Sequence, residues 1–319
     1  MPGPAAQWLP NRTRNRLAPR CPACGHGAIA TVRMNPSVYL NGGFVSLAEA
    51  RVPVMDRGFL FGDGVYEVVP VYSRRPFRLD EHLDRLDRSL AGIRLDNPLS
   101  RQAWREVVGR IVAEAAWDDQ SVYIQITRGP METRNHAFPK TVRPTVLVMP
   151  EPLLTPPQAQ RDAGVAAVSA ADIRWLRCDL KATSLLANCL LRQHAVEAGC
   201  AETVLFRDGF LTEGAASSIF VVRQGGLVVP PKGHLMLPGI TYDLVLELAA
   251  RHGLPAQVRD VLEAEVRAAD ELWMCSSTKE VLPIVALDGS AVGDGRPGPV
   301  FAKMYAWYQD FKRSVMRGA

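Results

Sequence analysis

Long apolar runs and cysteine-rich segments are both missing from this sequence of 319 residues. No stretch approaches the roughly 18 consecutive apolar residues that a membrane-spanning helix needs, so we expect no contact with a membrane. The six cysteines are scattered from Cys21 to Cys275, and they are too few for a disulfide scaffold in a chain of this length. The first residues also lack the apolar core of a secretory signal. Together these absences predict a cytoplasmic protein.

Acidic side chains are absent from residues 1–33, which contain five arginines. Because the whole chain carries a net charge of +4, the remaining residues have a net charge of −1. A nucleic-acid-binding domain would instead present a basic face or stripe, so we expect no nucleic-acid partner. The alternative is a binding module that contacts nucleic acid weakly through its basic arm. We interpret residues 1–34 as a disordered basic arm, because they follow neither a helix nor a strand period.

Cys21, Cys24 and His26 lie within this arm at a spacing that is typical of zinc ligands. A structural zinc site needs about four ligands, and no second Cys/His pair follows nearby. The sequence therefore favours a disordered arm over a metal site.

Regular hydrophobic patterning begins near residue 35. Because the chain is longer than most single domains and 47% hydrophobic, we expect two domains. The proline-rich residues 150–157 can continue neither a helix nor a central strand, so a linker is predicted at 151–158. The first domain, 35–150, is predicted to contain strands at 38–40, 44–45, 65–72, 121–127 and 145–149 and helices at 79–90 and 99–116. The second, 159–319, is predicted to contain helices at 182–197 and 241–252 and strands at 203–206, 219–222 and 271–275.

Two ionisable residues stand in apolar or small-residue surroundings. Lys181 follows an apolar segment and is predicted to enter a helix with a largely buried face. Burial favours a neutral amine, which imine formation with an aldehyde requires, although a lysine at a helix start can also be a solvated group. Glu213 ends a predicted strand before a run of small residues, which would let a flat ligand approach the backbone. It is equally compatible with an ordinary turn.

Two further segments are candidates for binding an anion. Gly239-Ile240-Thr241 opens a predicted helix, where free backbone N–H groups and a hydroxyl can face a phosphate. Ser276-Ser277-Thr278 follows a predicted buried strand and offers more hydroxyls. Arg85 on the 79–90 helix can supply a cation, although surface ion pairing is the common use of such an arginine.

Several motifs occur in one order along the chain. They are Asp56-Arg57-Gly58 with Gly62-Asp63-Gly64-Val65-Tyr66-Glu67, then Glu81-His82-Leu-Asp84-Arg85-Leu86, Ile173-Arg-Trp-Leu-Arg-Cys-Asp-Leu-Lys181 and Thr212-Glu213-Gly214. With these motifs the chain resembles the class IV, fold-type-IV aminotransferases, which depend on pyridoxal phosphate, and within them the D-amino acid aminotransferases. The resemblance covers about residues 37–312. It implies a two-domain protein with a small α+β amino-terminal domain and a larger carboxy-terminal domain, a mixed-sheet pseudo-barrel that binds the cofactor.

The resemblance also implies roles for individual residues. Lys181 would form a Schiff base with pyridoxal 5'-phosphate and later carry the substrate α-proton. Glu213 would pair with the pyridine nitrogen, because a carboxylate there keeps the ring protonated and able to accept electrons. The cofactor phosphate would be held by Arg85, Ile240, Thr241 and Ser277.

Substrate class depends on the segment Arg128-Gly-Pro-Met-Glu-Thr-Arg134-Asn-His136-Ala-Phe-Pro139. It resembles the loop with which D-amino acid aminotransferases bind the substrate α-carboxylate. The resemblance assigns this binding to Arg134 and His136, with help from Tyr66. In that family the loop reaches in from the neighbouring subunit, which implies a homodimer with a shared active site. An arginine–carboxylate pair fixes orientation, and orientation decides which enantiomer presents its α-hydrogen to Lys181.

We therefore expect ping-pong transamination between small amino acids and 2-oxo acids. D-Alanine would give up its amino group and leave as pyruvate, and 2-oxoglutarate would receive the group and leave as D-glutamate. Two alternatives on the same fold are a branched-chain L-amino acid aminotransferase and a 4-amino-4-deoxychorismate lyase. The pair Arg134-x-His136 is not expected in either alternative.

Overall fold

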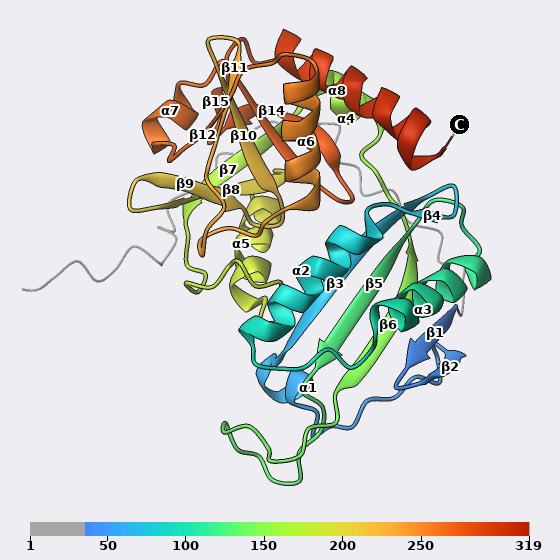
Figure 1. Cartoon of the computed structure of the whole chain (residues 1–319). Helices are drawn as coiled ribbons and strands as arrows, with labels where there is room; N and C mark the ends of the chain where they lie inside the picture. Colours follow the sequence, from blue (N-terminus) through green and yellow to red (C-terminus); the bar gives the residue numbers. More distant parts are fainter. Residues whose placement is uncertain (1–35, 319) are drawn as a thin grey trace, which may run out of the picture. The chain divides into compact units, whose positions relative to one another are not determined.

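The computed structural model describes residues 36–318. The predicted disordered arm at 1–34, with Cys21, Cys24 and His26, lies outside the described residues. The described chain contains two β-sheets, one of six strands and one of nine, each with its own helices (Figure 1). No helix within residues 36–318 combines the length and apolar character needed to cross a membrane.

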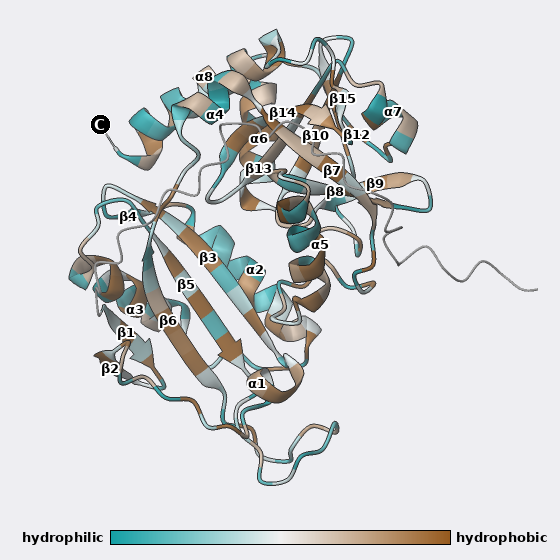
Figure 2. Cartoon of the chain, turned by 180° about the vertical axis from the view of Figure 1, so that it is seen from behind, coloured by the Kyte–Doolittle hydropathy of each residue, from teal (hydrophilic) through white to brown (hydrophobic). Residues whose placement is uncertain are grey.

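The six-stranded sheet comes from the first half of the chain. Its elements are β1 (Ser37–Leu40), β2 (Gly43–Ser46), α1 (Arg57–Phe61), β3 (Gly64–Tyr72), β4 (Arg75–Pro76), α2 (Leu79–Gly92), α3 (Arg101–Glu114), β5 (Gln120–Thr127) and β6 (Thr145–Pro152). All of its strand pairs are antiparallel, in the order β2-β1-β6-β5-β3-β4. Helices α2 and α3 cover one face of this sheet (Figure 1), and Figure 2 shows the sheet from behind.

Side chains along each strand point alternately to the two faces of this sheet, and this alternation decides which of them are buried. Val122, Ile124 and Ile126 of β5 are fully buried and join Leu83 and Leu86 of α2 in one core. The predicted turn between β1 and β2 is also present, with Asn41 and Gly42 both at positive φ.

The nine-stranded sheet comes from the second half. Its elements are α4 (Gln158–Ala163), β7 (Val165–Ala171), α5 (Leu186–Glu197), β8 (Glu202–Arg207), β9 (Phe210–Gly214), β10 (Ser218–Arg223), β11 (Gly226–Val229), α6 (Ile240–Arg251), β12 (Ala256–Val258), α7 (Glu263–Arg267), β13 (Glu271–Ser276), β14 (Glu280–Leu287), β15 (Ser290–Ala291), α8 (Pro299–Phe311) and a π-helical turn (Lys312–Met316). The main strand order is β12-β11-β10-β13-β14-β7-β8-β9. The sheet is mixed, because β11/β12, β14/β7 and β7/β8 pair in parallel and the other pairs are antiparallel.

A large apolar core lies between this sheet and helices α6 and α8. Fully buried Trp273 of β13 packs with Phe220 of β10, Leu244 of α6 and Met304 of α8. Because α6 is held by this packing, its first turn is fixed at the end of the sheet where the small residues 214–218 lie. That end of the sheet borders the cavity described below.

Three long elements of the second half, β7, β14 and α8, are absent from the sequence-based expectation, and two other elements begin or end elsewhere than expected. Strand β6 runs to Pro152, whereas prolines at 150 and 152 were expected to stop it at 149. The prolines are tolerated because residues 150–152 pair only with β5, while β1 reaches no further than Val148 of β6. Helix α5 begins at Leu186 rather than at residue 182. The helix was also expected to have a largely buried face, but its apolar Leu186 and Leu190 are 74% and 56% exposed.

Candidate active site

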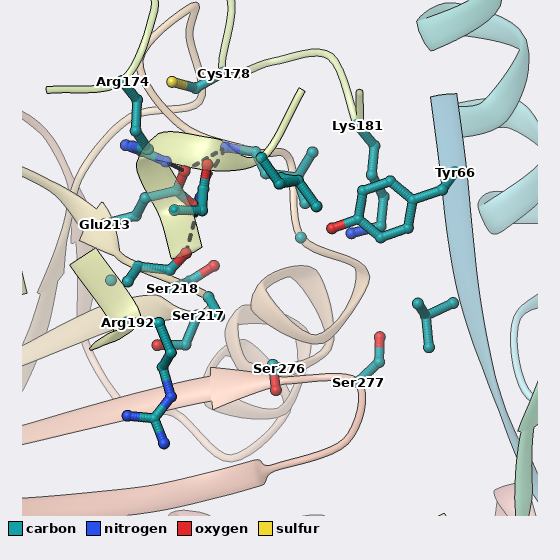
Figure 3. A pocket seen from close by; sticks show the side chains of 18 of the residues that line it. Tyr66, Arg174, Cys178, Lys181, Arg192, Glu213, Ser217, Ser218, Ser276 and Ser277 are labelled. Atoms are coloured by element: carbon teal, nitrogen blue, oxygen red, sulfur yellow. Dashed lines mark hydrogen bonds and ion pairs between the residues drawn. The ribbon is translucent and has the colours of Figure 1, made fainter. Parts of the chain in front are cut away.

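A cavity of about 580 Å³ brings together most of the residues that the sequence singled out. This size lies within the usual range for small-molecule sites. The predicted site residues on its walls are Tyr66, Arg85, Lys181, Glu213, Ile240, Thr241 and Ser277. Figure 3 shows Lys181 and Tyr66 on one side of the cavity and Glu213 on the other, with Ser276 and Ser277 below them in this view.

Lys181 is placed by backbone pairing with the first sheet. The Tyr66 N–H donates to the Lys181 carbonyl at 2.8 Å, and the Thr183 N–H donates to the Gly64 carbonyl at 3.0 Å. The segment after Lys181 therefore extends the edge of β3 instead of starting a helix, and Ala182 forms a bridge with Val65. As a result the Lys181 amine lies 4.1 Å from the centroid of the Tyr66 ring.

Glu213 is a buried carboxylate near the end of β9. Burial raises the pKa of Glu213 to about 7, against the opposing charge of Arg174. The Leu237 N–H also donates to both carboxylate oxygens, at 3.3 Å each. Without a ligand, the Glu213 carboxyl group therefore titrates near neutral pH. A cation or a hydrogen-bond donor that enters the cavity would favour its charged form.

Arg174 is the neighbour of Glu213 that the sequence did not identify. Its Nη1 donates to Glu213, and its Nε and Nη2 donate to the two oxygens of Asp172 at 2.9 and 2.8 Å. The Thr212 hydroxyl and the Arg207 side chain also contact Asp172. Arg174 lies inside the motif that ends at Lys181, but its pairing with Glu213 spans 39 positions. No local pattern in the sequence indicates so long-range an ion pair.

Arg85 is buried and is bound on several sides within the protein. Its Nε and Nη2 donate to the two oxygens of Glu67 at 2.7 and 2.8 Å, and its Nη1 donates to the Pro238 carbonyl at 3.0 Å. Burial opposes ionisation of Glu67, but the Arg85 guanidinium outweighs it and holds the pKa of Glu67 well below its usual range. His82 completes the group, with its Nδ1 2.8 Å from Glu67. Arg85 therefore joins α2 to the loop before α6 and is rigidly positioned on the cavity wall.

The start of α6 presents backbone N–H groups to the cavity. Ile240 and Thr241 form its first turn, and no side chain in the described part of the chain caps the helix. Gly239 precedes them, and a Cβ at this position would lie 3.2 Å from both Ser218 Oγ and Tyr242 Cβ. The unused N–H groups and the helix dipole make this corner suitable for a phosphate.

Arg134 and His136 are not brought to this cavity. None of the described residues 128–143 contributes to its walls. Both side chains are exposed and pack on the Phe61 ring, with the Arg134 guanidinium carbon 5.0 Å and the His136 ring 5.1 Å from its centroid. The sequence-predicted site is therefore divided into a cavity and a separate exposed loop.

The residues on the cavity walls fit pyridoxal phosphate. An amine, a buried carboxylate and an uncapped helix start line one cavity, which matches the aldehyde, the ring nitrogen and the phosphate of that group. Within residues 36–318 no group of three or more His, Cys, Asp or Glu side chains is arranged to hold a metal ion.

Comparison with known sequences places the chain in a family. The family model for amino-transferase class IV matches residues 64–287. A D-alanine aminotransferase of Bacillus licheniformis is 38% identical over 263 residues, which cover 82% of this chain and 92% of that relative. A D-alanine aminotransferase of Listeria monocytogenes serotype 1/2a (strain 10403S) is 36% identical over 273 residues, which cover 85% and 94% of the two chains.

Solved structures agree with this result. The branched-chain amino acid aminotransferase of Escherichia coli has a TM-score of 0.82 at 25% identity, covering 89% of this chain and 96% of that one. The branched-chain aminotransferase of the archaeon Thermoproteus uzoniensis, solved with norvaline, has a TM-score of 0.77 at 26% identity, with 89% and 95% coverage. These likenesses confirm the expected fold class. The chain belongs to the class IV aminotransferases, and it is a pyridoxal-phosphate-dependent aminotransferase.

Proposed function

We propose that this enzyme transaminates D-amino acids, with D-alanine and 2-oxoglutarate converted to pyruvate and D-glutamate in a ping-pong reaction. The main support is the exposed loop with Arg134 and His136, two side chains suited to a carboxylate, which occurs in a chain 34–38% identical to D-alanine aminotransferases. Lys181 and Glu213, the amine and the carboxylate that the reaction would use, line the cavity.

The cavity residues suggest how pyridoxal 5'-phosphate is held. Its phosphate would lie at the start of α6, where the N–H groups of Ile240 and Thr241, the Ser277 hydroxyl and the charge of Arg85 converge on one cavity. Glu213 would accept a hydrogen bond from the protonated ring nitrogen. A buried carboxylate with its pKa near 7 becomes fully charged once a cationic partner is beside it.

Pyridoxal phosphate supplies an aldehyde that condenses with amines and a ring that accepts the electron pair released at the substrate α-carbon. Lys181 provides the amine for attachment. Once substrate has displaced it, Lys181 Nζ would take the proton from the substrate α-carbon as a general base, hold it as an ammonium group and later give it up as a general acid. The Tyr66 ring beneath Nζ limits where this amine can move.

The substrate carboxylate would be bound by Arg134 and His136 of a second copy of the chain. Two observations support this arrangement. The loop does not line the cavity of its own chain, and its two side chains are exposed. Trp175, Leu176, Leu186 and Leu190, all close in sequence to Lys181, are also 47–74% exposed, and exposed apolar side chains in such number are typical of an interface. We therefore propose a homodimer whose active sites are completed across the interface.

A branched-chain L-amino acid aminotransferase is the second candidate. It is supported by the TM-score of 0.82 to the Escherichia coli branched-chain enzyme. Its disadvantage is the lower identity of 25%, against 38% for the Bacillus licheniformis D-alanine aminotransferase. A 4-amino-4-deoxychorismate lyase is the third candidate and has only the shared family in its favour.

The test is the first half-reaction of the purified, cofactor-loaded enzyme. D-Alanine should change the visible spectrum and release one equivalent of pyruvate per active site, whereas L-leucine should leave the spectrum unchanged. Reaction with L-leucine and none with D-alanine would overturn the proposal in favour of the second candidate. Pyruvate released from aminodeoxychorismate, without any requirement for an amino acceptor, would favour the third.

A further inference from the structure

Arg57, at the start of α1, has a buried guanidinium that binds the backbone of the Arg134 loop. The side chain is only 3% exposed. Its Nη1 donates to the carbonyls of Asn135 and Ala137 at 2.6 and 3.2 Å, and its Nη2 donates to the carbonyl of His136 at 3.0 Å. One side chain therefore binds three consecutive carbonyls of an otherwise irregular loop.

Phe61, at the other end of α1, supports the side chains of the same loop. Its ring lies 5.0 Å from the Arg134 guanidinium carbon and 5.1 Å from the His136 ring centroid. The Arg57 guanidinium lies 5.0 Å from the same ring. Arg57 thus fixes the loop backbone, while Phe61 provides the surface on which its two functional side chains rest.

The Arg57 guanidinium is itself held in place from the other side. Its Nε donates to Asp63 at 2.7 Å, and Arg128 donates to both oxygens of Asp63 at 2.9 and 3.1 Å. The Phe138 ring packs on the Arg128 guanidinium at 3.6 Å and on that of Arg57 at 5.7 Å. Because Nε is bound to Asp63 and both terminal nitrogens are bound to the loop, the Arg57 guanidinium is held at all three of its nitrogens.

We infer that Arg57 and Phe61 are positioning residues for substrate recognition, which set Arg134 and His136 to receive the α-carboxylate of an amino acid. The inference rests on the proposed function, because it gives Arg134 and His136 the role proposed there. Neither Arg57 nor Phe61 lines the large cavity, so neither has a direct part in holding the cofactor. Their effect should be confined to substrates that carry a carboxylate.

A lysine at position 57 would keep the positive charge but not the geometry. Its single nitrogen cannot bind three carbonyls and Asp63 in the directions that the planar fork allows. The loop would then sample several arrangements, and only a fraction of them would present Arg134 correctly. Because several hydrogen bonds to the loop would be lost together, Arg57→Lys should weaken the apparent affinity for D-alanine roughly tenfold.

The experiment is a double-mutant cycle on the cofactor-loaded enzyme. The rate of the spectral change is measured against D-alanine concentration for the wild type, Arg57→Lys, Arg134→Ala and the double variant. If Arg57 acts through Arg134, Arg57→Lys should weaken D-alanine binding in the wild type and have little further effect in Arg134→Ala. Phe61→Leu is carried through the same cycle, so that the inference is tested even if Arg57→Lys yields no folded protein.

Ethylamine, which is alanine without its carboxylate, separates positioning from general damage. Its slower reaction should be unchanged by Arg57→Lys and by Phe61→Leu. Arg74→Lys is the matched control, because Arg74 also donates to three carbonyls, those of Val112, Ala113 and Ala115, and to a carboxylate, but at the end of α3. Arg74→Lys should leave the reactions with D-alanine and with ethylamine unchanged.

The outcomes distinguish the inference from the proposed function. If Arg134→Ala itself leaves D-alanine binding unchanged, the role proposed for the loop fails and the inference fails with it. Suppose that Arg134→Ala weakens D-alanine binding, but the effects of Arg57→Lys and Phe61→Leu simply add to that of Arg134→Ala. In that case, or if both variants slow the reaction with ethylamine as much as the reaction with D-alanine, only the inference is overturned. Non-additive losses of binding that are confined to D-alanine support both the inference and the proposed function.

Discussion

The Lys181 amine lies 4.1 Å from the centroid of the Tyr66 ring, and the Tyr66 N–H donates to the Lys181 carbonyl at 2.8 Å. The two residues belong to different halves of the chain, and backbone pairing along β3 sets their separation. The amine therefore occupies a defined position in the cavity instead of swinging freely from a helix end.

Replacement of this amine should abolish the reaction. Lys181→Ala is expected to lose nearly all turnover and the visible absorbance of the loaded enzyme, because no other lysine lines the cavity in the described part of the chain. Borohydride reduction followed by peptide mass analysis should locate the cofactor on residue 181 of the wild type. Lys232→Ala, which removes an exposed lysine paired with Asp243, is the control. Full activity of Lys181→Ala would refute the assignment.

The raised pKa of Glu213 predicts a pH-dependent stability of the cofactor-free protein. Its pKa is about 7 in the folded chain against a reference of 4.5, so between these values the folded state binds more protons than the unfolded state. The stabilising contribution is thus complete below pH 4.5 and is lost as the pH rises through 7. The side chain of Glu213→Gln cannot ionise, so the stability of this variant relative to the wild type should increase as the pH rises over this interval. Denaturant unfolding of both proteins from about pH 5 to 8 measures the difference, and a difference that is independent of pH would contradict the prediction.

Arg174 should control the charge of Glu213 in the working enzyme. Arg174 opposes the burial that raises the pKa of Glu213, so Arg174→Met should raise this pKa further. Because the negative charge of the carboxylate is what keeps the ring nitrogen protonated, the acid limb of the kcat/KM profile should move to higher pH. Arg207→Met is the matched control, since Arg207 contacts Asp172 but not Glu213. Equal displacement of the profile in both variants would argue against a specific effect of Arg174.

The start of α6 should discriminate between phosphorylated and unphosphorylated cofactor. Thr241→Val keeps the branched shape of the side chain and removes the hydroxyl of a residue that lines the cavity and whose N–H our proposal assigns to the phosphate. A hydrogen bond to a charged group contributes about 1.5–3 kcal/mol, so affinity for pyridoxal phosphate should fall roughly tenfold or more. Affinity for pyridoxal, which lacks the phosphate, should stay the same. Titration of the cofactor-free protein with each compound measures the two affinities. Equal losses of affinity for pyridoxal phosphate and for pyridoxal would place the phosphate elsewhere.

The root of the Arg134 loop requires a glycine. Gly129 has a φ of +83°, and a Cβ there would lie 1.8 Å from the Arg143 carbonyl oxygen. Gly129→Ala should therefore destabilise the protein by at least the roughly 1–3 kcal/mol of a strained backbone. Gly109→Ala, inside α3 with open space around the Cβ, should instead stabilise it by about 0.5–1 kcal/mol. Chemical denaturation of both variants gives the comparison, and a neutral Gly129→Ala would show that the loop relaxes freely.

Local patterns predicted most elements of the first half of the chain but missed β7, β14 and α8 of the second half. The hairpin at Asn41 and Gly42, helix α2 with its apolar Leu83 and Leu86, and strand β13 all lie where periodicity placed them. The misplaced end of β6 and the misplaced start of α5 have tertiary causes. Pro150 lies in β6 because the neighbouring strand β1 ends earlier, and Ala182 and Thr183 do not start a helix because they pair with the open edge of β3.

The sequence by itself determined the residue types that a phosphate, a ring nitrogen and an aldehyde require, because Lys181, Glu213 and Gly239-Ile240-Thr241 occur in recognisable local motifs. Only the tertiary structure decided how these groups are held. The pairs Arg174–Glu213, Arg85–Glu67 and Arg57 with the 135–137 carbonyls join elements that are distant along the chain. Each of these contacts forms within one half of the fold, where a helix, strand or loop packs on another and a buried guanidinium meets a carboxylate or backbone carbonyls. A local sequence pattern carries no record of that packing.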